Sequence, residues 1–222
     1  MVSLARRGAA ARREDAAETQ RLAALWEREL ALREQGYRVV AGVDEAGRGC
    51  LAGPVVAAAV VLPPGIFIEA LDDSKRLSPR QREEIYGVIR LMARAIGVGE
   101  VSPARIDEVN ILQATYLAMR QAVFNLGLRP EHLVVDALRI PGLDCPQSPI
   151  IHGDALCASI AAASIVAKVT RDSRMRELDR LYPQYGFGDN KGYCTLDHRR
   201  ALTRHGPCPI HRRSFRWPAV ES

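Results

Sequence analysis

Two apolar, β-branched runs stand on either side of a short glycine-rich segment in this chain. Residues 37–44 (YRVVAGVD) and 54–62 (PVVAAAVVL) have the length and composition of strands, and residues 47–53 (GRGCLAG) join them. Residues 93–101 predict a third strand, and residues 132–138 (HLVVDAL) and 148–154 (SPIIHGD) predict two more. Three early strands followed by strands that alternate with helices indicate an α/β layer domain.

Helices are predicted from caps and apolar spacing. Ser78 followed by Pro79 and Gln81 is a helix start, with Ser78 as the cap. Leu22, Leu25, Trp26 and Leu30 form one apolar stripe, which indicates an amphipathic helix that docks on the main body. Three more helices are expected. One ends near Gly127, one covers residues 158–182, and one runs from about Thr195 to His205 and is ended by Gly206.

Composition limits the organisation and the partners. The chain has 222 residues, 47% of them hydrophobic, which suits one domain with a small appendage. We expect residues 1–36 to be a frayed tail and amphipathic helix, and residues 37–222 to be one domain with a C-terminal helical portion and a basic tail. The net charge of +5 favours nucleic acid only modestly, because solubility explains it equally well. The five cysteines lack metal-ligand spacing, and no apolar stretch reaches membrane-spanning length, so a cytoplasmic protein is expected.

Four acidic residues lie at the ends of the predicted strands: Asp44, Glu45, Asp136 and Asp154. Ligands gather near strand ends in α/β sheets, so these side chains could converge, and bound Mg²⁺ or Mn²⁺ would relieve their repulsion. Adjacent strand residues point to opposite faces, so Glu45 can join Asp44 only if the strand ends or bulges there. The alternatives are local: Asp154 as a helix cap and Asp136 as a turn residue.

The glycines of the same segment also suggest a dinucleotide site. Gly47, Gly49 and Gly53 form G-x-G-x-x-x-G, which is one residue off the usual fingerprint, and that fingerprint requires a helix to begin at the glycines. Here Pro54 and a valine-rich run predict a strand instead. The dinucleotide interpretation is therefore rejected.

Several longer motifs occur together in order: GVDEAGRG (42–49), LAGPVV (51–56), DSKRLS (73–78), AAASIVAKVTRD (161–172), KGY (191–193) and HRRSF (211–215). Over roughly residues 38–216 the chain resembles bacterial ribonuclease HII. The resemblance implies a ribonuclease H-like fold, with a mixed five-stranded sheet flanked by helices and a C-terminal helical substrate-binding portion. It also implies a metal-dependent endoribonuclease with two Mg²⁺ or Mn²⁺ ions.

The implied reaction is cleavage on the 5′ side of a ribonucleotide in an RNA–DNA hybrid or embedded in duplex DNA. The products carry a 3′-hydroxyl and a 5′-phosphate, and the implied roles are removal of misincorporated ribonucleotides and of RNA primers. The resemblance assigns the catalytic and metal-binding positions to Asp44, Glu45, Asp136 and Asp154. It assigns the backbone loop around the ribonucleotide to Gly47, Arg48 and Gly49, and the sugar-packing position to Tyr193. Small departures from the family pattern stand at Cys50, His152, Asp189, Asn190 and Cys194.

Basic side chains are candidates for phosphate contacts. Lys75, Lys168 and Arg171 are the first candidates, and Arg174 continues a three-residue spacing along the predicted long helix; a solvated basic face explains that stripe equally well. Asp172 is expected to orient Lys168 or Arg171. The tail residues His211, Arg212, Arg213 and Phe215 either contact DNA or pin the tail, whereas His198 and His205 are expected on a helix surface.

Two other functions belong to similar folds. Ribonuclease HIII prefers longer hybrids, but it carries glutamate at the fourth acidic position and a folded N-terminal domain, whereas here the fourth acid is Asp154. A non-catalytic nucleic-acid-binding domain would not need all four acids. We expect a monomer that acts on RNA–DNA hybrid or ribonucleotide-containing duplex DNA, without a membrane partner.

Overall fold

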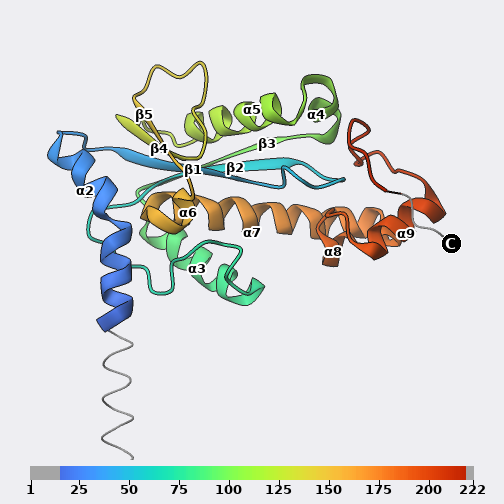
Figure 1. Cartoon of the computed structure of the whole chain (residues 1–222), viewed down its shortest axis with the longest axis horizontal. Helices are drawn as coiled ribbons and strands as arrows, with labels where there is room; N and C mark the ends of the chain where they lie inside the picture. Colours follow the sequence, from blue (N-terminus) through green and yellow to red (C-terminus); the bar gives the residue numbers. More distant parts are fainter. Residues whose placement is uncertain (1–15, 219–222) are drawn as a thin grey trace, which may run out of the picture.

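The structure is a computed structural model that describes residues 16–218; the predicted frayed tail lies outside the described residues. Its centre is a five-stranded sheet in the order β3-β2-β1-β4-β5 (Figure 1). β1 pairs antiparallel with β2, and β2 with β3, whereas β1–β4 and β4–β5 are parallel, so the predicted mixed sheet is confirmed. The strands are β1 (Val40–Ala46), β2 (Val55–Val61), β3 (Ala95–Val101), β4 (His132–Asp136) and β5 (Gln147–Ile150).

Helices cover both faces of the sheet (Figure 1). Ser78 forms the expected capping box with Gln81, and Thr195 caps the last helix, which ends at Gly206. The region predicted as one helix up to Gly127 is two helices, because Asn110 has φ +68° and caps the second of them. The helices are α2 (Glu27–Glu34), α3 (Pro79–Met92), α4 (Pro103–Val109), α5 (Ile111–Phe124), α6 (Gly153–Leu156), α7 (Ala158–Leu181), η1 (Pro183–Tyr185), α8 (Phe187–Asn190) and α9 (Leu196–His205).

The long helix α7 packs closely on β1. A Cβ atom at Gly42 would lie 2.1 Å from the backbone carbon of Ser159, so only glycine permits this approach. The alanines of the first half of α7 are fully buried against the sheet, and α5 packs on its other face. This close packing fixes α7 relative to β1.

The N-terminal helical region docks on the body, as predicted, but not with the whole predicted stripe. Leu22, Leu25 and Trp26 are buried, and the Trp26 indole donates to Ile66 O at 2.9 Å. The helix is interrupted by a turn at Trp26, and Leu30 beyond it is 46% exposed, so its predicted burial is wrong. Glu29 is buried instead, where it accepts hydrogen bonds from the Ser159 amide and hydroxyl.

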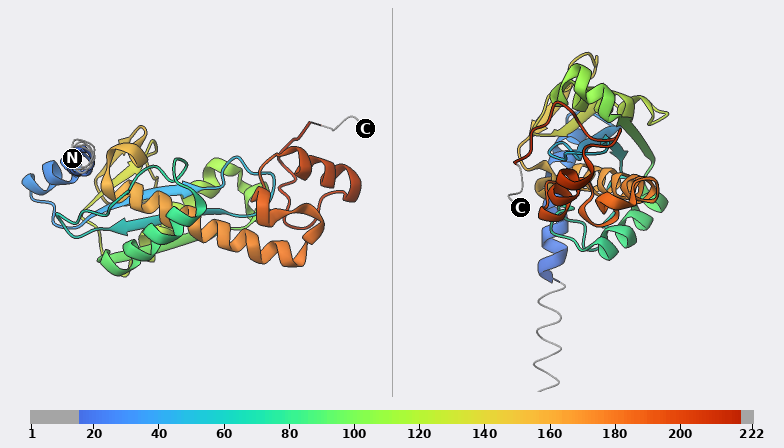
Figure 2. Two further views of the ribbon diagram at one scale, coloured as in Figure 1. Left: turned by 90° about the horizontal axis from the view of Figure 1, so that it is seen from below. Right: turned by 90° about the vertical axis from the view of Figure 1, so that its right-hand side faces the viewer.

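The C-terminal portion lies at the far end of α7, opposite the N-terminal helix (Figure 2). Its small core contains Leu51, Ala52, Met175, Tyr185, Phe187 and Leu202. After α9 the chain returns to the glycine-rich segment: Ala52 bridges to His211, and the Gly53 amide donates to Ile210 O at 2.9 Å. No helix in residues 16–218 is both long and apolar enough to cross a membrane.

Candidate active site

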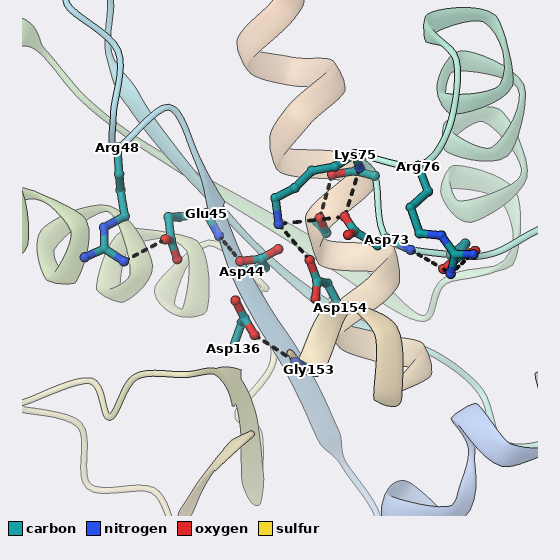
Figure 3. Close-up of polar contacts among 12 residues, drawn as sticks. Asp44, Glu45, Arg48, Asp73, Lys75, Arg76, Asp136, Gly153 and Asp154 are labelled. Carbon is teal, nitrogen blue, oxygen red and sulfur yellow. Dashed lines mark hydrogen bonds and ion pairs between the residues drawn. The ribbon is translucent and has the colours of Figure 1, made fainter. Parts of the chain in front are cut away.

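The four predicted acids lie together at one edge of the sheet (Figure 3). Asp44 and Glu45 belong to the last part of β1, and Asp136 is the last residue of β4, its parallel neighbour. Asp154 lies in the first turn of α6, directly after β5. The carboxyl ends of parallel strands meet at one edge, so the topology brings these side chains together.

Glu45 reaches this group although β1 neither ends nor bulges there. The pairing with β2 continues through Asp44, Glu45 and Ala46 in an unbroken register, so the expected interruption is wrong. The parallel pairing with β4 stops at Val43 instead. β1 therefore projects past β4 and leaves an open edge, where carboxylates from both faces can approach Asp136.

Burial and mutual repulsion disfavour the charged carboxylates. Burial, together with the charges of Glu45 and Asp136, raises the pKa of Asp44 well above its usual range. Burial also raises the pKa of Asp136, with Asp154 adding to the effect. The pKa of Glu45 is raised by burial and by Asp136, although Arg48 opposes this. The site is therefore short of positive charge.

Two cations contact the acids from the outside. Arg48 Nη1 lies 3.2 Å from Glu45 Oε1, and Lys75 Nζ lies 2.9 Å from Asp154 Oδ2. Partial burial lowers the pKa of Lys75, but the hydrogen bond that Lys75 donates to Asp154 and the negative charges of Asp154, Asp73 and Asp44 together raise that pKa overall. The Lys75 side chain is 76% exposed, so it stays accessible to a ligand.

The donor set suits a hard divalent cation. All candidate ligands are carboxylate oxygens, which Mg²⁺ and Mn²⁺ prefer. Glu45 Oε2 is buried and has no hydrogen-bond partner within the described part of the chain, so one carboxylate oxygen of the site is unsatisfied. As the side chains stand, no three His, Cys, Asp or Glu residues between 16 and 218 converge closely enough to hold one ion.

The glycine-rich loop follows Glu45 directly. Gly47 has φ +92°, and a Cβ atom there would lie 1.9 Å from Arg171 Nε, so this glycine is required by packing. Gly49 is exposed, and a Cβ atom there would meet nothing within 4 Å. Only Gly49 therefore leaves open space where a ligand could approach the backbone.

Tyr193 lies at the surface next to basic side chains. Tyr193 is 42% exposed, and the centroid of its ring lies 5.5 Å from Lys168 Nζ and 5.8 Å from Arg171 Cζ. The Leu51 amide donates to Gly192 O at 2.8 Å, which ties the Tyr193 segment to the glycine-rich loop. A tyrosine that packed in the core would be buried, so this exposure does not fit a purely structural role.

The predicted basic stripe on α7 is not one surface. Residues three apart are rotated by about 300°, so Lys168, Arg171 and Arg174 drift around the helix. Lys168 is paired with Asp172 at 2.8 Å, and Arg174 is paired with Glu100 and Glu177. Asp172 thus orients Lys168, one of the two expected partners.

Arg171 does not fit the expected phosphate contact. It is fully buried, and its guanidinium donates to the carbonyls of Pro54, Ala52 and Lys191 at 2.9–3.1 Å. All three donor nitrogens are thus engaged by backbone. Arg171 joins the glycine-rich segment to the loop that carries Tyr193.

The predicted position of one histidine is wrong, and the structure decides between the two alternatives for the tail. His198 was expected on a helix surface but is fully buried, whereas His205 is exposed. In the tail, His211 and Arg212 are buried and pin the chain, while Arg213 is exposed. The HRRSF motif was a visible signal, but a single sequence does not reveal which arginine is buried.

The chain is similar in sequence to proteins of one family. The family model "Ribonuclease HII" matches residues 41–217. The chain is 53% identical over 204 residues to ribonuclease HII of Moorella thermoacetica, a match that covers 92% of this chain and 99% of that protein.

Solved structures show the same fold. Ribonuclease H2 from Pyrococcus horikoshii superposes with a TM-score of 0.65 at 29% identity, covering 80% of this chain and 93% of that one. Ribonuclease HII from Archaeoglobus fulgidus, solved as a complex with PCNA, gives a TM-score of 0.65 at 30% identity, covering 82% of this chain and 98% of that one.

Proposed function

The chain belongs to the ribonuclease HII family and is a ribonuclease H, a hydrolase that cleaves RNA in RNA–DNA hybrids. Within that activity, we propose that it cuts the phosphodiester on the 5′ side of a ribonucleotide, in hybrids or embedded in duplex DNA. The products then carry a 3′-hydroxyl and a 5′-phosphate. Removal of misincorporated ribonucleotides is the process that this specificity serves.

The observation that carries this proposal is the continuity of the acids with the glycine-rich loop. Asp44 and Glu45 lie in the last part of β1, and after Ala46 the chain runs directly into Gly47, Arg48 and Gly49. A group held by the acids would therefore be only a few residues from the exposed Gly49. That arrangement suits an enzyme that must recognise the sugar next to the bond it cuts.

We further infer that Asp44, Glu45, Asp136 and Asp154 hold two divalent ions, Mg²⁺ or Mn²⁺. Such a pair of ions, when bound, supplies an activated water and stabilises the leaving oxygen. The raised pKa values of three of these acids and the unsatisfied Glu45 Oε2 support the inference, because each indicates a site that lacks cations. Lys75 is exposed beside Asp154 and is suited to contact a substrate phosphate.

Recognition of the ribose is assigned to the loop and to Tyr193. The 2′-hydroxyl distinguishes RNA from DNA because it both donates and accepts hydrogen bonds. Backbone groups of Gly47, Arg48 and Gly49 contact that hydroxyl in our proposal, while the ring of Tyr193 packs on the sugar. The exposure of Gly49 and Tyr193 supports these roles. A monomeric state and a cytoplasmic setting stay predictions.

The direct test uses a DNA duplex with one embedded ribonucleotide beside the same duplex made entirely of DNA. We expect cleavage of the first only, in Mg²⁺ or Mn²⁺ but not in EDTA, with a 3′-hydroxyl upstream of the ribonucleotide. A longer RNA–DNA hybrid in the same assay separates this specificity from the ribonuclease HIII type. Cleavage confined to the longer hybrid would contradict the embedded-ribonucleotide activity.

A further inference from the structure

Arg212, in the C-terminal tail, is fully buried against the glycine-rich loop. Its guanidinium donates to three backbone carbonyls: Nε to Gly53 O at 3.0 Å, Nη1 to Arg48 O at 2.8 Å and Nη2 to Gly47 O at 2.7 Å. The ring of Phe215 covers it, with 5.0 Å from Cζ to the centroid. A charge in this position is costly to bury, so the hydrogen bond made by each of its three nitrogens is informative.

These contacts determine which way the neighbouring amides point. In a trans peptide unit the C=O and the following N–H point in opposite directions. Because the carbonyls of Gly47 and Arg48 turn inward to Arg212, the amides of Arg48 and Gly49 turn away from it. Within residues 16–218, neither of these two amides donates a hydrogen bond. Two adjacent donors are therefore free beside the acids.

Arg212 is itself held firmly. Its amide donates to Leu51 O at 2.8 Å, and the next two amides, of Arg213 and Ser214, donate to Asp107 at 2.9 Å each. Burial lowers the pKa of Arg212 to about 10, so the guanidinium remains charged at neutral pH. The tail thus delivers a fixed cation to the inner side of the loop.

We propose that Arg212 is a positioning residue for ribose selection. By turning the carbonyls of Gly47 and Arg48 inward, it presents the amides of Arg48 and Gly49 as a pair of donors to the 2′-hydroxyl and adjoining phosphate of the ribonucleotide. The inference rests on the proposed function of the glycine-rich loop. Arg212 acts through the loop and does not touch the substrate.

The test compares Arg212→Lys with the wild type, because one ammonium group cannot hold three carbonyls in the same geometry. Binding is measured by fluorescence anisotropy in EDTA, with a duplex containing one ribonucleotide and with its all-DNA counterpart. We expect the variant to lose about tenfold of the preference for the ribonucleotide duplex, the scale of one or two hydrogen bonds. Its affinity for the all-DNA duplex should not change. Arg213→Lys, the same change at the exposed neighbour, is the matched control and should retain the preference.

The possible results distinguish the proposed role of the glycine-rich loop from the proposed role of Arg212. A wild type without any preference would overturn the loop's proposed role and this inference together. A wild type with the preference and a folded Arg212→Lys that keeps it would overturn the inference alone, as would an equal loss of affinity for both duplexes. If Arg212→Lys does not fold, Arg212→Gln is measured in its place, because its amide can still donate to backbone carbonyls. If neither folds, Arg212 is a folding residue and the inference is wrong.

Discussion

The Nε2 atoms of His198 and His211 lie 3.0 Å apart inside the C-terminal portion, where the two residues are 0% and 2% exposed. The Cys208 amide donates to His211 Nδ1 at 2.9 Å, so His211 carries its proton on Nε2 and donates it to His198. His198 then carries its proton on Nδ1 and donates it to Tyr193 O at 2.8 Å. Two neutral histidines thus link the tail to the backbone of Tyr193.

This pair predicts a loss of stability in acid. Burial lowers the pKa of both histidines, and the pKa of His211 falls from 6.5 to about 4, with His198 contributing. The facing groups, Cys208 and Tyr185, are neutral here because burial raises the pKa of each. His211 takes up a proton below about pH 6.5 in the unfolded chain, but only below about pH 4 in the folded protein. Across this window the pair should therefore lower the melting temperature as the pH falls, against the opposite contribution of Asp44, Glu45 and Asp136, whose pKa values are raised.

Two histidine variants test this prediction, one at the buried pair and one at an exposed histidine as the control. His211→Asn keeps an acceptor for the Cys208 amide but does not titrate, so its melting temperature should depend less steeply on pH in this window. His205→Asn, at the exposed end of α9, should leave the wild-type dependence unchanged. Identical pH dependence in all three proteins would exclude the buried pair as the cause.

Asp136→Asn should abolish most cleavage without unfolding the protein. The amide oxygen can still accept from the Gly153 amide, at 2.8 Å in the wild type, while one repelling charge is lost. We expect a single-turnover rate lower by at least about a hundredfold, the scale of removing one key electrostatic group. Asp197→Asn, at a side chain that is 89% exposed, is the control. A near-normal rate in Mg²⁺ would remove Asp136 from the site.

Lys75 and Lys168 should differ in the salt dependence of substrate binding. Each phosphate contact that is lost lowers the slope of log K against log salt by about one unit. Lys75 is 76% exposed, whereas Lys168 is 17% exposed and paired with Asp172. We expect Lys75→Ala to flatten the slope by about one unit and Lys168→Ala to flatten it less. A larger effect at Lys168 would show that substrate displaces Asp172.

Tyr193→Ala should reduce cleavage at a single ribonucleotide far more than it lowers the melting temperature. The side chain lies half-exposed on the surface, so its removal leaves no large cavity. The matched control is Phe187→Ala, at a fully buried ring of the same portion, which should cost about 3–5 kcal/mol of folding free energy. Proportionate losses of stability and rate in Tyr193→Ala would make that residue structural.

The two loop glycines should separate stability from recognition. Gly49→Ala places a methyl group in open space, so the fold should persist while cleavage slows because the sugar must occupy that space. Gly47→Ala places it 1.9 Å from Arg171 Nε at φ +92°, so this variant should be strongly destabilised. Melting temperatures and single-turnover rates of both variants check the pair. A fully active Gly49→Ala would argue against close approach of the sugar.

Local patterns were enough to predict the strands, the cap at Ser78, the helix that starts near Thr195, and the acids at the strand ends. These features depend on residues close together in the chain, where periodicity and capping act directly. The convergence of Asp44 with Asp136 also followed, because parallel strands align their carboxyl ends.

Only the tertiary structure decided which polar side chains are buried. Arg212 donates to Gly47, 165 residues away, and nothing near Arg212 in the sequence distinguishes it from the exposed Arg213. His198 and Arg171 were misplaced for the same reason. Whether a charged or polar side chain can be buried depends on partners that supply its hydrogen bonds, and folding brings those partners from distant segments.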